Sequence, residues 1–494
     1  MARTGSAIKG VLRPSPHIKA FSQLAMMDTA NSPRTESETT PLIPAGVSKR
    51  PKTPLPKFQI GILMMLHVTE PIASMSIFPY INQLIRELGI TGGDEAAVGY
   101  YAGIIESLFF VMQALTVLKW SRLSDRIGRK PVLSIGLFGT CISMLCFGLS
   151  TTFWSLVVSR CMCGALNGNI GVLKTTIAEL TDSTNIAQGF ALIHVFWKIG
   201  TFVGPLIGGM LARPQDNWPR LFAHSFWSKY PYFLPCAVAA CLVVLAYLML
   251  LFFFEETLST KRRPKLTSTT SSIISRANVD DREVLAQESM ADMPMRSLLT
   301  PTIVIPIANY SMLSLLDLSL RTVMPLFFST PMYLGGLGLT PSSIGSWMAL
   351  FGLVEGVFQV LFFAKIIDWL GPKRLFLRVG VVLRTNHACV SDHVVAFLTI
   401  IWGMGFALLQ GLSSCSSQAS APAKNVLGAI NGLGQTSSSV ARAVGPALAT
   451  SLFAFSKERN LLNGNAVFVV LIMLAGVLRW LASQLPDELK DRDE

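Results

Sequence analysis

The chain has 494 residues, of which 51% are hydrophobic and only 14% charged, and its formal net charge is +12. Soluble domains are typically about 25% charged. With a mean hydropathy of +0.49, the composition indicates a bundle of membrane helices rather than one soluble core. The basic residues cluster beside apolar runs, at 49–52, 119–130 and 261–265. This pattern is typical of loops beside an anionic lipid leaflet, so the bilayer is the expected partner and nucleic acid is excluded.

The first 57 residues are polar, rich in Ser, Thr and Pro, and lack apolar periodicity, which predicts a disordered cytosolic tail. Residues 1–27 contain no acid and resemble a transit peptide, but prolines and glycines interrupt any amphipathic helix. Residues 38–43 resemble an acidic dileucine sorting signal. The vacuolar and plasma membranes both stay open as locations.

Apolar runs long enough to cross a bilayer, about 20 residues, follow in two sets of six. The first set forms a predicted six-helix bundle over 58–254, with spans at 58–84, 97–118, 131–149, 153–172, 189–211 and 231–254. A polar segment, 255–299, is a predicted cytosolic linker. The second bundle, 300–485, has spans at 301–328, 344–363, near Leu375, and at 394–412, 426–455 and 466–485. A charged tail, 486–494, ends the chain. An even number of spans places both termini in the cytosol.

A short basic loop, 121–130, separates the second and third spans, and loops of this kind stay in the cytosol. Asp125 lies among its cations and Gly128 permits a tight turn. The second half repeats these features at nearly the same spacing, with Asp368 matching Asp125 and Gly445-Pro446 matching Gly204-Pro205. The sequence therefore predicts two duplicated halves.

The loop resembles the G-x-L-x-D-R-x-G-R-K motif of major facilitator superfamily transporters, with Ser121 in place of the first glycine. The resemblance implies an all-α membrane protein of twelve spans in two pseudo-symmetric six-helix bundles. It also implies a conformational latch formed by Asp125, Arg126, Gly128, Arg129, Lys130 and Asp368.

Two further motifs carry the resemblance into the spans. Gly200, Gly204 and Gly208 form a smooth stripe on a helix, and with Pro205 and Gly209 they match the G-x-x-x-G-P-x-x-G-G pattern of facilitator antiporters. Close helix packing alone would also explain the glycines. Arg160 lies in an R-x-x-Q-G-like motif with Cys163 replacing Gln, and the resemblance associates this arginine with proton coupling.

The chain also resembles the zinc-induced facilitator-like group of drug:proton antiporters, particularly its fungal branch. Segments 69–73, 79–81, 166–172, 179–182, 428–435 and 442–446 carry this likeness, which extends over about 54–486. The resemblance implies proton-coupled export of metal chelates, zinc or small organic solutes.

Ionisable residues inside spans are costly unless protonated or paired, so they are candidate members of a proton-coupling and substrate cavity. They are Glu70, His67, Glu106, Arg160, Lys198, Asp317 and Glu355. Asp317 and Arg321 are spaced i,i+4, so they could form a purely structural ion pair. His67 could share the proton of Glu70 or simply line the cavity.

Together these features predict a monomeric secondary active transporter that exports a small organic solute, or sequesters it in the vacuole, in exchange for protons. A zinc or metal-chelate transporter is the alternative, although the linker lacks a histidine-rich metal loop. A receptor or sensor with the same fold but no transport is a second alternative. No phosphate-binding loop motif is present, and we expect no enzyme activity, cofactor or bound metal.

One segment does not fit this prediction. Residues 384–393 are polar where the ninth span should continue. Such a stretch in lipid is expensive unless it lines water, so we interpret it as an altered segment rather than a designed gate. A chain that carries it could be inactive.

Overall fold

Apolar runs in lipid must satisfy their backbone polar groups internally, which favours helices. The computed structural model describes residues 53–182, 185–257, 300–370, 424–462 and 464–485, and these residues form helices and no strand. All of them belong to one unit, Lys52–Glu494. Most of the predicted N-terminal tail, most of the linker, the ninth and tenth spans, the segment 384–393 and the C-terminal tail 486–494 lie outside the described residues.

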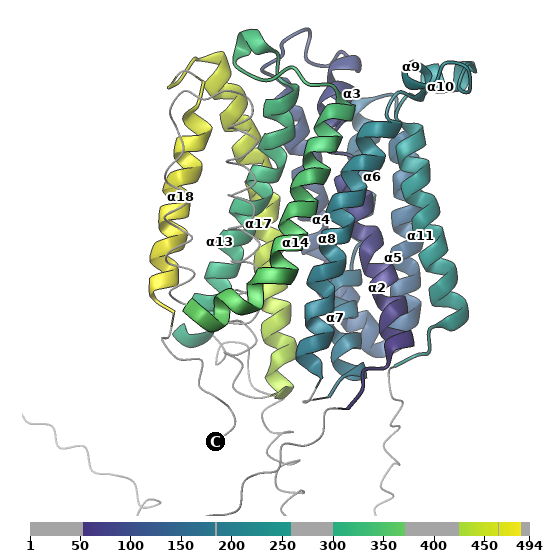
Figure 1. The fold of residues 1–494 in the computed structure, drawn as a ribbon, viewed down its shortest axis with the longest axis vertical. Coiled ribbons are helices and arrows are strands. Elements are labelled where there is room, and N and C mark those ends of the chain that lie inside the picture. Colours follow the sequence, from purple (N-terminus) through teal and green to yellow (C-terminus); the bar gives the residue numbers. More distant parts are fainter. Residues whose placement is uncertain (1–52, 183–184, 258–299, 371–423, 463, 486–494) are drawn as a thin grey trace, which may run out of the picture. The chain divides into compact units, whose positions relative to one another are not determined.

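Helices of the first half pack side by side in Figure 1. They are α2 (Lys57–Met75), α3 (Ile81–Glu87), α4 (Val98–Ile127), α5 (Arg129–Gly148), α6 (Phe153–Leu166), α7 (Asn169–Leu180), α8 (Ile186–Leu211), α9 (Pro214–Asn217), α10 (Ser225–Lys229) and α11 (Phe233–Phe253). The described helices of the second half are α13 (Pro301–Ser329), the short 3-10 helix η2 (Met332–Leu334), α14 (Pro341–Leu370), α17 (Lys424–Glu458) and α18 (Ala466–Ser483). Within the described residues, nine helical segments are long and apolar enough to span a membrane.

Three predicted boundaries differ from the structure. The first predicted span is divided into α2 and α3, because Pro79 has no backbone N–H and restricts the residue before it. The predicted loop 121–130 is almost entirely helical, since α4 continues to Ile127 and α5 starts at Arg129. Only Gly128, at φ 106°, separates them, a conformation that favours glycine.

The fourth span is also discontinuous, because α6 ends at Leu166 and α7 begins at Asn169. At the break, the indole N–H of Trp120 donates to the Ala165 carbonyl oxygen at 2.7 Å. Gly168 packs so closely on Trp120 that a Cβ there would overlap the indole. A break in a spanning helix frees backbone and side-chain polar groups at membrane depth, where they are tolerated beside protein or water.

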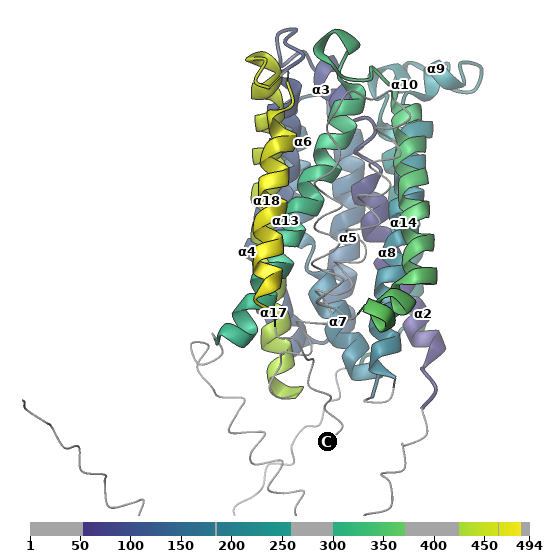
Figure 2. The ribbon, with the colours of Figure 1, turned by 60° about the vertical axis from the view of Figure 1, so that its left-hand side comes forward.

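The two halves contact each other along α4 with α17 and along α8 with α14. Figure 2 shows the same arrangement from a second direction, with α3, α9 and α10 together at one end of the bundle. We call this the α3 end, and we call the end with the turn at Gly128 the Gly128 end. The Ser107 hydroxyl accepts the Ala447 N–H at 2.9 Å, and the Ser342 hydroxyl donates to the Gly209 carbonyl at 3.0 Å. These contacts lie toward the α3 end of each helix.

Glycines make this close approach possible, as the sequence predicted for span five. A Cβ on Gly204 would lie 3.0 Å from the Ile72 carbonyl oxygen, and one on Gly208 would overlap the Ser76 carbonyl. The adjacent Gly209 faces α14, where a Cβ would lie 2.8 Å from Gly345 Cα. The glycine pattern therefore packs α8 against α2 in its own half and against α14 in the other half.

Candidate functional site

A cavity of about 150 Å³ lies between the two halves, displaced from their close contacts toward the Gly128 end of α8 and α17. Helices α2, α4, α7 and α8 of the first half and α13 and α17 of the second contribute its walls. Its aromatic and apolar lining includes Phe109, Phe110, Phe190, Ile193, Trp197 and Leu318. Its charged and polar lining includes His67, Glu70, Gln113, Lys174, His194, Tyr310, Asp317, Arg321, Gln435 and Arg442.

Glu70 is the lining carboxylate whose partner is an uncharged amide. Asn167, at the break between α6 and α7, donates from Nδ2 to Glu70 Oε1 at 2.8 Å. The described residues give Oε2 no hydrogen bond, and the side chain is only partly buried against the cavity. One turn earlier on α2, His67 packs beside Trp197, with ring centroids 5.7 Å apart, and its Nε2 has no partner among the described residues. Because its one hydrogen bond comes from an uncharged amide, Glu70 is able to exchange a proton or a cation with the cavity.

Two cations approach the cavity from opposite halves. Lys174 on α7 donates from Nζ to Gln435 Oε1 on α17 at 3.4 Å. Arg442, two turns further along α17, lines the cavity beside Tyr310. Within the described part of the chain, neither cation forms an ion pair with a carboxylate. Both therefore keep charge that a solute could use.

Four other charges form a cluster that joins the halves. Lys198 Nζ on α8 lies 2.7 Å from Glu355 Oε1 on α14, and the two residues are 6% and 1% exposed. Arg321 Nη2 lies 3.4 Å from Glu355, and Arg321 Nε lies 3.0 Å from Asp317 Oδ1. Two cations and two carboxylates balance, which offsets much of their desolvation cost. The i,i+4 pair expected from the sequence thus becomes part of a larger network.

Glu106 and Arg160 form a separate buried ion pair between α4 and α6. They are 6% and 2% exposed, and the Arg160 guanidinium lies 5.0 Å from the centroid of the Phe109 ring. Neither residue lines the cavity in the described structure, and the same is true of Lys198 and Glu355. The predicted cavity residues therefore divide into three that line it, His67, Glu70 and Asp317, and four that are buried beside it.

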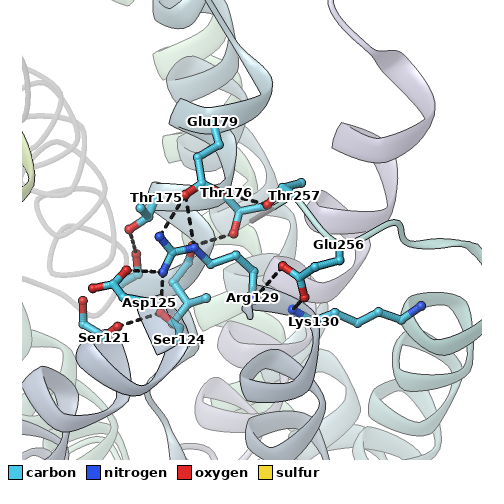
Figure 3. A network of polar contacts seen from close by, with 12 residues as sticks. Ser121, Ser124, Asp125, Arg129, Lys130, Thr175, Thr176, Glu179, Glu256 and Thr257 are labelled. Atoms are coloured by element: carbon cyan, nitrogen blue, oxygen red, sulfur yellow. Dashed lines mark hydrogen bonds and ion pairs between the residues drawn. The ribbon is translucent and has the colours of Figure 1, made fainter. Parts of the chain in front are cut away.

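A polar network connects Asp125, Arg129, Lys130, Glu179 and Glu256, as Figure 3 shows. Arg129 Nη1 donates to Asp125 Oδ1 at 2.6 Å, and Arg129 Nη2 donates to Glu179 Oε1 at 2.8 Å. Glu256 accepts the backbone N–H groups of Arg129 and Lys130 at 2.8 and 3.0 Å, so a carboxylate caps the first turn of α5. All these residues belong to the first half or to the first residues of the predicted linker.

The remaining predicted latch residues are placed differently. Arg126 is exposed, and the Lys130 ammonium donates to the Phe254 carbonyl oxygen at 2.7 Å rather than to Asp125. Asp368 lies on α14, but its side chain is outside the described residues. Arg129 is thus the cation that holds Asp125 in the described structure.

Sequence reasoning missed several lining residues, namely Lys174, His194, Tyr310, Gln435, Arg442 and, behind Glu70, Asn167. Lys174 could have been found as an ionisable residue just beyond the predicted fourth span. Asn167-Gly168 is a dipeptide typical of chain breaks, and it lies within that span. No local signal indicates that Asn167 would reach Glu70, which is 97 residues away in the chain.

Comparison with known proteins agrees with this architecture. Residues 63–446 match the Major Facilitator Superfamily family. The chain is 31% identical to the major facilitator-type transporter psiT2 of Psilocybe cyanescens over 90% of this chain and 93% of that protein. It is 27% identical to ZINC INDUCED FACILITATOR-LIKE 1 of Arabidopsis thaliana, over 83% and 87% of the two chains. The predicted superfamily and the fungal and zinc-induced facilitator-like resemblance are confirmed.

Solved structures show the same fold. The human organic anion transporter MFSD10 superposes with a TM-score of 0.63 at 19% identity, over 87% of this chain and all of that one. A D-xylose-proton symporter superposes with a TM-score of 0.62 at 15% identity, over 88% and 98% of the two chains. The predicted all-α membrane fold is confirmed. The family and fold of the chain are those of transporters rather than enzymes. The chain belongs to the Major Facilitator Superfamily.

Proposed function

We propose that this multi-pass membrane transporter exchanges a small organic solute for protons through the cavity between its halves, with Glu70 as the proton carrier. The proposal is carried by one observation: the Glu70 carboxylate faces the cavity and accepts a single hydrogen bond, from the neutral amide of Asn167. A carboxylate that is not neutralised by a fixed cation can gain and lose a proton as its access to water changes.

The alternative proton carrier, Glu106, is less suited to this role in the described structure. Its carboxylate is buried against Arg160, and protonation would leave that guanidinium without its counter-ion. Arg160 instead holds Glu106 and supports Phe109, which lines the cavity. We therefore infer a supporting role for the Glu106–Arg160 pair.

We also propose that the structure represents the state in which the cavity is open to the cytosol. The close contacts of Ser107 with Ala447 and of Gly209 with Ser342 lie toward the α3 end. The cavity lies toward the Gly128 end, where Lys174 reaches Gln435 across it. A short basic segment such as 121–130 is expected on the cytosolic face. Export from the cytosol, to the outside or into the vacuole, would load solute in this state.

Proteoliposomes with an imposed pH gradient test the proposal. The purified full-length protein should accumulate one or more members of a panel of organic acids, cationic drugs and metal chelates against a concentration gradient. Glu70→Gln should reduce this uphill accumulation at least about tenfold, because the side chain can no longer exchange a proton at neutral pH. Downhill exchange of the same solute should persist.

Glu458→Gln is the matched control, since Glu458 is exposed at the end of α17 and remote from the cavity lining. Proteoliposomes with this variant should accumulate as much solute as those with the unmodified protein. Full gradient-driven accumulation by Glu70→Gln would refute Glu70 as the carrier. Size-exclusion chromatography of the purified variant would separately detect misfolding or aggregation.

A further inference from the structure

The charges that face the cavity are unequal once internal pairing is counted. Asp317 and Arg321 line the cavity, but they pair with each other within the balanced cluster that also contains Lys198 and Glu355. Apart from the histidines, three ionisable groups remain for a solute, namely Glu70, Lys174 and Arg442. One is an acid with an amide partner, and two are cations without a carboxylate partner in the described residues.

These three groups come from different helices, so the cavity has a polarity. Glu70 is on α2, Lys174 is on α7 and Arg442 reaches the cavity from α17 of the other half. A purely cationic solute would be attracted by Glu70 but repelled by Lys174 and Arg442. A purely anionic solute would be attracted by Lys174 and Arg442 but repelled by Glu70. Only a solute with both charges can use all three groups.

The rest of the lining defines the body of the solute. Phe109 and Phe110 from α4, Phe190 and Trp197 from α8 and Tyr310 from α13 contribute aromatic surface around the charged groups. Aromatic faces favour flat or bulky apolar groups, and Tyr310 adds a hydroxyl beside Arg442. The lining therefore combines an aromatic and apolar surface with one carboxylate and two cations.

We propose that the cavity binds a zwitterionic organic solute with an aromatic or bulky apolar body, its anionic group held by Lys174 and Arg442 and its ammonium group by Glu70. The inference rests on the proposed function and deepens it. A proton and the ammonium group would compete for the same Glu70 carboxylate, which is the requirement for exchange. The anionic group would contact α7 and α17, and so would connect the two halves around the solute.

Equilibrium binding without any pH gradient tests the charge requirement. The full-length protein in lipid nanodiscs would be titrated at neutral pH with three probes that share a phenyl ring and a short chain. They are L-phenylalanine, which carries both charges, phenethylamine, which lacks the carboxylate, and 3-phenylpropionate, which lacks the amine. L-phenylalanine should bind at least about tenfold more tightly than either analogue, the factor that one charge-assisted hydrogen bond supplies.

Variants assign each charge to its group. Lys174→Gln and Arg442→Gln should each weaken L-phenylalanine binding while leaving phenethylamine binding unchanged or stronger. Glu70→Gln should weaken L-phenylalanine and spare 3-phenylpropionate. Lys457→Gln removes a cation whose ammonium donates to the Gly335 carbonyl, away from the cavity lining, so binding should not change.

The outcomes separate this inference from the proposed function. Binding of L-phenylalanine no tighter than that of both analogues, including no binding of any probe, would overturn the zwitterion site. Proton-driven accumulation of another solute would then still support the proposed function. Tight L-phenylalanine binding lost in Lys174→Gln, together with full uphill transport by Glu70→Gln, would support the site and refute the proton carrier.

Discussion

Two carboxylates inside the first half show how the partners of a residue decide its role. Glu70 and Glu106 are both single acids in apolar helices, and the sequence gives them equal standing as proton carriers. In the folded chain, Glu106 has a guanidinium partner and Glu70 has an amide partner. A buried ion pair resists protonation of its acid because the cation would lose its counter-charge. The two glutamates therefore differ in the partner that a neighbouring helix places beside them, and not in their own chemistry.

A double-variant experiment on Glu106 and Arg160 tests this assignment at the residue scale. Arg160→Gln leaves a buried carboxylate without its cation, and removal of one partner of a buried pair costs about 3–5 kcal/mol in soluble proteins. We therefore expect a clear fall in the thermal midpoint of the purified protein. The double variant Glu106→Gln, Arg160→Gln should recover much of that loss. Equal instability of the single and double variants would contradict a mainly structural pair.

At the scale of elements, the glycines of α8 determine how closely α2 approaches. A methyl group on Gly208 would overlap the Ser76 carbonyl oxygen, so the two backbones would have to separate. Overpacking of this kind typically costs about 1–3 kcal/mol. Gly208→Ala should lower both the thermal midpoint and the yield of monodisperse protein.

Gly476→Ala is a matched control for this prediction. Gly476 lies inside α18, and a Cβ there would have no heavy atom within 4 Å. Alanine is favoured over glycine in helix interiors, so stability should stay equal or rise. If Gly208→Ala were as stable as Gly476→Ala, close packing would not be the reason for the glycine stripe.

At the scale of the whole molecule, Asp125 is predicted to act as a latch between the halves. In the described part of the structure its carboxylate contacts Arg129 of its own half, and its side chain is 56% exposed. This arrangement is the one expected with the latch open. A contact made in only one of two states shifts their populations by its own differential free energy, and about 1.4 kcal/mol changes the ratio tenfold.

Asp125→Asn should therefore slow turnover several-fold while changing solute affinity little. Labelling of a cysteine introduced at Gln435, which lines the cavity, should become faster from the cytosolic side because the open state gains population. Glu458→Gln is a suitable control, since Glu458 is exposed at the end of α17 and away from the cavity lining. Unchanged turnover together with unchanged labelling in Asp125→Asn would show that no such latch operates.

The sequence determined the class of the protein, the presence of membrane-length apolar helices in its first half and the closeness of α8 to its neighbours. These features follow from local patterns, because lipid demands long apolar helices, cytosolic loops collect basic residues, and glycines four residues apart share a helix face. The helical continuation of α4 to Ile127 was missed, since Arg and Asp are compatible with both a helix end and a loop.

Only the tertiary structure decided which charges face one another. Lys198 lies beside Glu355, and Glu70 lies beside Asn167, because α8 packs on α14 and the break between α6 and α7 faces α2. Lys174 and Arg442 come to one cavity from opposite halves for the same reason. Such pairings depend on the rotation and register of packed helices, which no local pattern encodes, so the site could be assembled only from the fold.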